Sequence, residues 1–201
     1  MPTDIYKTLP ELNILFQEMI IAMLGYTKTG SPAAYAEAAY KAVRVAWPTE
    51  GAPAWKITDD VACIRVVEDD HAINREREDE YENIDDGLTL NEATSYTRVL
   101  NLFIAFYGPS SFEHAQEVRD CLFKNVYRQY LAEYSIYLVP DIVAPRRAPE
   151  PFQGQWWERT DLELRFNEKV VKNDEINSIG SAEVAVYDRN GLVAEIEITE
   201  T

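Results

Sequence analysis

The first 25 residues place their apolar side chains at helical spacing, with Leu9, Leu12, Phe16, Ile20 and Met23 three or four positions apart. The segment from Thr8 to Glu11 has the form of a capping box, and Pro10 falls in the first turn, where its missing N–H costs nothing. The pattern predicts a helix that ends near Gly25. Ile14 and Ile21 fall on a second face, which either lies in the core or meets another subunit.

Three later segments have the pattern of strands. Residues 43–47 and 61–67 are short and rich in β-branched side chains. Residues 94–107 carry apolar side chains on both faces, so we expect a long central strand that is buried on both sides. Residues 31–40 favour a short helix after Ser31 and Pro32.

A second helix is predicted after the central strand. Ser110 to Glu113 has the form of another capping box, and the helix is expected to run to about Tyr130. Its core stripe is formed by Ala115, Val118, Leu122 and Val126. Residues 139–154 then hold four prolines around Arg146 and Arg147, which predicts an extended connector or arm.

The C-terminal part has the alternation of β-structure. Leu162, Leu164 and Phe166 define a half-buried strand, and residues 182–199 form a hairpin around Asn190 and Gly191. A two-residue loop would place glutamates on the same face as valines. A three-residue loop with a glycine bulge pairs Val186 with Ala194 and Val184 with Ile196. Burying an unpaired carboxylate costs several kcal/mol, against about 0.2–1 kcal/mol for a cross-strand pair, which favours the second register.

These elements predict an α+β fold. A largely antiparallel sheet is flanked by an N-terminal helix and a long central helix, and a β-hairpin ends the chain. A length of 201 residues, at about 150 residues per domain, favours a single domain over residues 1–201.

The charge of the chain argues against one class of function and marks one acidic segment. The chain has 35 acidic and 19 basic residues, a formal net charge of −16, spread over both halves. Such a protein is not expected to bind nucleic acid by sequence, because phosphate contacts dominate that affinity. Residues 68–92 hold eleven acids and two arginines, which predicts a solvated acidic loop.

The cysteines and the hydropathy of the chain indicate the cellular compartment in which the protein is made. Cys63 and Cys121 sit in apolar patterns, so two reduced core thiols are expected in preference to one long-range disulfide. Residues 12–24 are too few and too polar to span a bilayer, and no signal peptide is recognised. We expect a product made in the cytoplasm, with no membrane partner.

Candidate chemistry is sparse. His71 beside three acids is more typical of a solvated turn than of a metal site, and His114 with Glu117 is typical of a helix surface. Glu183, Glu195 and Glu197 imitate the carboxylate pair of a glycosidase, although outward acids are ordinary on a strand. We predict no catalytic, cofactor-binding or metal-binding residues. The proline-rich arm, the aromatic pair Trp156 and Trp157 and the two-faced helix indicate assembly.

Several stretches resemble one family. They are Arg44–Val45–Ala46–Trp47–Pro48–Thr49, Gly51–Ala52–Pro53–Ala54–Trp55, residues 59–67, Ile73–Asn74–Arg75, Tyr107–Gly108–Pro109, Ala115 and Val118–Arg119–Asp120. Together they resemble the neck terminator, or tail terminator-like, proteins of tailed bacteriophages, mainly contractile-tailed ones. The resemblance covers about residues 5–130. Residues 27–40 depart from it, since a shorter link is expected there.

The resemblance implies a virion structural protein. It implies a ring, expected to be hexameric, at the head-proximal end of the tail, where it stops tail-tube polymerisation and meets the head–tail connector. The implied partners are other copies of the chain, the tail tube protein, the sheath protein and the connector, with DNA passing through the lumen without specific binding. The alternatives are a head-closure or adaptor component, a carboxylate-dependent hydrolase and a plain binding module.

We expect ten residues at the lumen or at an interface with neighbouring proteins: Glu76, Glu78, Asp79, Glu80, Arg146, Arg147, Trp156, Trp157, Glu195 and Glu197. The acids among them are candidates for the channel wall, because an acidic wall repels phosphate and lets DNA slide.

Overall fold

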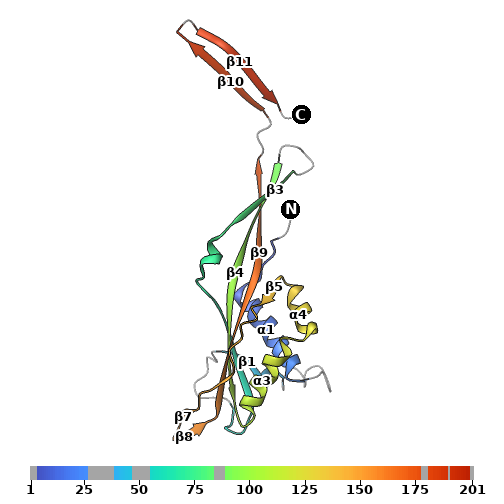
Figure 1. Ribbon diagram of the computed structural model, residues 1–201, viewed down its shortest axis with the longest axis vertical. Helices are drawn as coiled ribbons and strands as arrows, with labels where there is room; N and C mark the ends of the chain where they lie inside the picture. The colour runs from blue at the N-terminus through green and yellow to red at the C-terminus, as the bar shows by residue number, and fades with distance from the viewer. Residues whose placement is uncertain are drawn as a thin grey trace. The chain divides into compact units, whose positions relative to one another are not determined.

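A computed structural model describes residues 4–26, 39–46, 55–83, 89–177, 181–189 and 191–199 (Figure 1). Two segments lie outside these ranges. They are most of the helix expected over residues 31–40, and residues 47–54, which carry part of the family resemblance. Two compact units can be distinguished within the chain. One comprises Tyr6–Glu76 and Thr97–Val170, and the other comprises Met1–Ile5, Arg77–Tyr96 and Val171–Thr201.

Helix α1 (Leu9–Met23) forms where the periodicity predicts it. The capping box is present: the hydroxyl of Thr8 accepts from the backbone N–H of Glu11, and the Glu11 carboxylate accepts from the backbone N–H of Thr8 at 2.8 Å. Gly25, with φ 74°, follows the helix. Ile21 is buried, whereas Ile14 is 52% exposed, so the second face is only partly covered.

The sheet is mixed and mostly antiparallel, which gives an α+β fold. Its strands follow the order β1-β2-β4-β9-β5, with β3 paired to β4 and β6 paired to β9. Only β1 and β2 are parallel among the pairings described. The bounds are β1 (Val43–Val45), β2 (Val61–Glu68), β3 (Glu78–Asn83), β4 (Thr89–Tyr107), β5 (Ile136–Leu138), β6 (Arg146–Arg147) and β9 (Arg159–Asn177).

The core lies between the helices and one face of this sheet. Helices α1, α3 (Ser111–Cys121) and α4 (Asn125–Ala132) lie together beside β4 and β9 (Figure 1). The rings of Phe16 and Phe166 pack with their centroids 4.8 Å apart. On β4 the residues that belong to this core are Leu100, Leu102, Ile104 and Phe106. Their alternation fixes which face of the central strand meets the helices.

The other face of β4 only partly fits the prediction of a strand buried on both sides. Val99 is buried, but Phe103 is 40% exposed, and Ala105 and Tyr107 are half-buried. The reason is that α1, α3 and α4 pack on a single face of the sheet. The strand ends at Gly108, whose φ of 103° suits glycine and where a Cβ would come within 2.6 Å of the Asp59 carbonyl oxygen.

The long central helix is instead two helices, and its predicted capping box is wrong. The chain turns after Cys121, Lys124 takes an extended conformation, and α4 starts at Asn125. Ala115, Val118 and Leu122 are buried as predicted, but the turn leaves Val126 63% exposed and buries Leu131 in its place. Ser110 makes no side-chain cap, because its φ and ψ of −98° and 19° are not those of an N-cap.

The acidic loop predicted over residues 68–92 is partly wrong. The short helix η1 (Ala72–Arg75) precedes β3, which pairs antiparallel with β4, so Glu78 lies opposite Ser95 and Glu82 opposite Asn91. Polar cross-strand contacts stabilise a strand that has no apolar face. The Thr94 hydroxyl donates to Asp79 at 2.7 Å, and the Tyr81 hydroxyl donates to Glu92 at 2.8 Å. All six residues of β3 are exposed, so the segment is solvated but ordered as a strand.

The proline-rich segment is extended and carries only short strands. After β6, strands β7 (Glu150–Phe152) and β8 (Gln155–Trp157) form a two-stranded hairpin. Its turn residues, Gln153 and Gly154, both have positive φ, 48° and 77°, as a type I′ turn requires.

The C-terminal hairpin has the predicted register. β10 (Ser181–Asp188) pairs with β11 (Gly191–Thr199), with Val184 opposite Ile196 and Val186 opposite Ala194. The turn differs from the prediction. Asp188 pairs with Gly191, and the bulge lies further along β11, opposite the step between Val186 and Tyr187. Of the side chains in these two strands and at Arg189, the structure describes those of Ala185 and Arg189, both exposed.

Candidate functional site

The sheet face that the helices leave open forms a groove of about 750 Å³. Strands β2, β4 and β9 supply its floor, and residues 143–146 supply one side. Cys63 pairs with Ala105 and Arg65 with Phe103, so these four residues lie together on neighbouring strands. Val143, which lines the groove, is exposed. An apolar floor open to solvent is typical of an interaction surface.

An aromatic cluster lies beside this groove. The Trp55 ring packs against Tyr107 at 5.6 Å and meets Trp157 edge-on at 6.5 Å, and Phe152 packs against Trp157 at 5.8 Å. Trp156 and Trp157, which we expect at an interface, therefore differ in exposure. Trp157 is buried in the cluster, whereas Trp156 is 69% exposed, because alternation along β8 turns neighbouring side chains to opposite faces.

The polar groups near the cluster are paired. Arg159 forms ion pairs with Glu150 and Asp161, both at 2.7 Å, and the Tyr107 hydroxyl donates to Glu150 at 3.0 Å. Burial and the hydrogen bond to Glu150 together raise the pKa of Tyr107 to about 12, against the opposing charge of Arg159. Burial also raises the pKa of the Cys63 thiol, although Arg44 and Arg159 oppose that shift. A protonated thiol is a poor nucleophile, so the groove has no activated cysteine.

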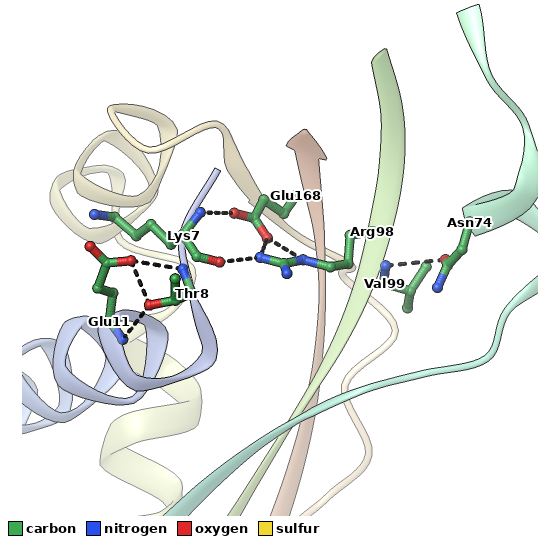
Figure 2. A network of polar contacts seen from close by, with 7 residues as sticks. All are labelled: Lys7, Thr8, Glu11, Asn74, Arg98, Val99 and Glu168. Carbon is green, nitrogen blue, oxygen red and sulfur yellow. Dashed lines mark hydrogen bonds and ion pairs between the residues drawn. The ribbon is translucent and has the colours of Figure 1, made fainter. Parts of the chain in front are cut away.

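A buried ion pair joins the sheet to the segment before α1 (Figure 2). The guanidinium of Arg98 donates from Nε to the Glu168 carboxylate at 2.8 Å, and it also donates to the carbonyl oxygen of Lys7. Glu168 in turn accepts from the backbone N–H of Lys7 at 3.0 Å. On the neighbouring residue of β4, the Val99 N–H donates to the Asn74 side chain at 3.2 Å.

The predicted interface residues lie on separate elements. Glu76 follows η1, and Glu78, Asp79 and Glu80 are exposed on β3. Arg146 and Arg147 are exposed on β6, where Arg146 lines the groove and Arg147 lies 5.0 Å from the Phe112 ring centre. Glu195 and Glu197 belong to β11, opposite Ala185 and Glu183. Sequence inspection missed Phe103 as a groove residue and missed the pair of Arg98 and Glu168.

Within the described ranges no group of His, Cys, Asp and Glu residues is arranged to hold a metal ion. His71 is exposed and its ring accepts from the Ile73 N–H at 3.3 Å, and both cysteines are free thiols. No helix in the described part of the chain is long and apolar enough to cross a membrane.

An α+β body with an open apolar sheet face and ordered two-stranded hairpins is the architecture of a protein that binds other proteins. The chain belongs to the phage neck terminator protein family, whose profile matches residues 11–190. The resemblance found in the sequence is thereby confirmed. Membership makes the chain a structural protein of the virion neck that associates with other phage head and tail proteins, and it points to a non-enzymatic role. No curated protein matches the chain.

Proposed function

We propose that copies of this chain form a closed ring, expected to be hexameric, that caps the head-proximal end of the tail tube. The ring stops tube polymerisation and joins the tail to the head–tail connector. The observation that carries the proposal is the hairpin β10–β11. Among the described strands neither of the two pairs with a third one, and an isolated two-stranded hairpin is marginally stable in water. Contact with a neighbouring subunit would stabilise it.

Charge supports passage of DNA through the ring without binding. Glu76, Glu78, Asp79 and Glu80 are exposed, and the whole chain carries a net charge of −16. We assign these acids, together with Glu195 and Glu197, to the channel wall. Negative charge along a channel raises the energy of a phosphate near the wall, so the duplex slides without forming the contacts that hold DNA-binding proteins in place.

Two exposed features suit contacts with other neck and tail proteins. Arg146 and Arg147 form a basic site on an acidic protein, and a local excess of one charge steers a partner of opposite charge. Trp156 is a large exposed aromatic, a residue type that anchors protein interfaces. We assign these residues to contacts with the tail tube protein, the sheath protein or the connector.

Purified protein tests the ring directly. Native mass spectrometry and particle imaging at about micromolar concentration should show a closed ring, and the ring should bind to the ends of purified tail tubes and limit their growth. Binding to isolated connector in preference to tube ends would assign the chain to the head-closure layer instead. A monomer that associates with neither would overturn the proposal.

A further inference from the structure

The open sheet face in the unit of Tyr6–Glu76 and Thr97–Val170 has the character of an interface and no cover among the described residues. Phe103 and Val143 expose apolar surface there, while Ala105 and Cys63 complete the floor. Arg65 and Arg146 also line it, together with Asp161 and Glu163. A folded chain rarely leaves such a surface in contact with water unless another molecule covers it.

The hairpin β10–β11 supplies a segment of matching pattern. Its register places six aliphatic positions in three opposed pairs: Ala182 with Ile198, Val184 with Ile196 and Val186 with Ala194. Glu183, Ala185, Glu195 and Glu197 occupy the alternate positions. One aliphatic set of positions and one set dominated by carboxylates is typical of strands with one buried face, and two strands cannot bury that face by themselves.

Charge and residue type indicate that the hairpin β10–β11 and the groove fit each other. The hairpin carries four carboxylates and a single arginine, Arg189. The groove is lined by three arginines and two carboxylates, and one of those carboxylates is paired with Arg159, so the groove has a small excess of positive charge. Strand β3, all of whose residues are exposed, has no aliphatic residue with which to cover Phe103. Two different, complementary surfaces on one chain make a head-to-tail contact, which closes into a ring when repeated by rotation.

We propose that the aliphatic face of β10–β11 of one copy lies in the open groove of the next copy, over Phe103. This inference rests on the proposed ring and specifies the contact that closes it. Each copy then donates one hairpin and accepts another, so every groove in the ring is covered.

Cysteine cross-linking tests the contact, because Cys63 already lies in the groove. Single substitutions Val184→Cys, Val186→Cys, Ala194→Cys and Ile196→Cys are made in the full chain and oxidised with copper phenanthroline at a pH above about 9, because burial raises the pKa of the Cys63 thiol and the thiolate is the reactive form. A disulfide forms only when the two Cα atoms approach within about 7 Å. At least one variant should give a ladder of covalent oligomers on a non-reducing gel.

Matched variants assign the cross-link. Cys63→Ser in the same background should abolish the ladder. That loss would show that the cross-link is made by Cys63 and not by the buried Cys121. Ala185→Cys, on the alternate face of β10, should cross-link at least about tenfold less. Rings that form without cross-links at any of the four positions would overturn the proposed contact but would leave the proposal of a ring standing. A purely intramolecular disulfide would also overturn it, and absence of rings would overturn both proposals.

Substitution in the groove gives an independent measurement. Phe103→Glu places a carboxylate under the hairpin and should raise the protein concentration needed for ring formation by about tenfold or more. Its control is Tyr137→Glu, on an exposed residue of β5 that does not line the groove. Equal assembly by the two variants would contradict the inference, provided that both keep the circular dichroism spectrum of the wild type.

Discussion

Arg98 of β4 and Glu168 of β9 form an ion pair in which the Glu168 side chain is fully buried. Both partners also bond the main chain of Lys7, so one pair fixes two neighbouring strands and the segment that leads into α1 (Figure 2). A buried charge is tolerated only when its partner and its hydrogen bonds are present. The pair is therefore expected to be stable as a unit and costly to break.

The first prediction is that removing one partner destabilises the protein more than removing both. Glu168→Leu should lower the free energy of unfolding by about 3–5 kcal/mol, because it leaves the Arg98 guanidinium buried without a carboxylate. The double variant Arg98→Met with Glu168→Leu should lose less. Urea unfolding of the two single variants and the double variant measures the coupling.

The exposed pair of Arg75 and Asp70, at 3.0 Å, is the control. Asp70→Asn should change the free energy of unfolding by at most about 1 kcal/mol, because water screens the interaction. A double variant as unstable as the sum of its two single variants would show that Arg98 and Glu168 do not stabilise each other.

The buried pair shows how much of the core could be predicted from the alternation of residues along the sequence. Leu162, Leu164 and Phe166 were correctly predicted on one face, and the same alternation continues to Glu168. On β4, Arg98 likewise shares its face with Leu100 and Leu102. Two opposite charges on the buried faces of two strands predict a pair if the strands are neighbours. The sequence did not show that adjacency, because β4 and β9 are far apart in the chain.

A second prediction separates two helix starts that look alike in sequence. Thr8 caps α1 through its side chain, whereas Ser110 makes no side-chain cap at α3. Thr8→Ala should lower the free energy of unfolding by about 1 kcal/mol, and Ser110→Ala by less than about 0.5 kcal/mol. Equal losses in urea unfolding would contradict the assignment of caps.

The absence of a side-chain cap at Ser110 shows that local sequence rules do not include contacts with distant parts of the chain. The backbone N–H of Ser110 donates at 2.8 Å to Asp60, fifty positions earlier in the chain. That contact arises from the pairing of β2 with β4, which a local motif cannot report. The break before α4 has a similar origin, since burial of Leu131 depends on a neighbouring element rather than on the helical period. The register of β10–β11 was predictable because both strands are adjacent in sequence and burial costs chose between two pairings.

A third prediction concerns alkaline pH. Burial raises the pKa of Tyr107 from 10.0 to about 12 in the folded protein. Its contribution to stability is therefore complete below pH 10 and is lost as the pH rises through the folded-state pKa. Tyr107→Phe should reduce the fall in the free energy of unfolding between those pH values, measured by urea unfolding.

Two controls define this measurement. Tyr130 also has a pKa raised to about 12 by burial, so part of the alkaline loss should persist in Tyr107→Phe. Tyr137→Phe, at an exposed position, should leave the pH dependence as in the wild type. An unchanged slope in Tyr107→Phe would show that the burial of Tyr107 does not affect alkaline stability.

The last prediction tests the acidic channel wall by reversing its charge. The wild-type ring should not retain duplex DNA at low salt. A variant with Glu78→Lys, Asp79→Lys and Glu80→Lys should retain it, with an affinity that falls as salt rises, because each phosphate contact releases counterions. The control variant carries Glu113→Lys and Asp120→Lys on α3 and Glu133→Lys at the C-cap of α4, the same change in charge at exposed positions in or next to helices. Filter binding of linear DNA compares the two variants.

Topology of the DNA distinguishes a channel from an outer surface. A preformed closed ring can thread a linear duplex through its lumen but cannot thread a covalently closed circle. If Glu78, Asp79 and Glu80 line the channel, the β3 variant should bind linear DNA and bind the circle weakly. The helical control should bind both forms alike, since its lysines act from outside. Equal binding of both forms by the β3 variant would place these acids on the outer surface, and solubility would then suffice to explain their charge.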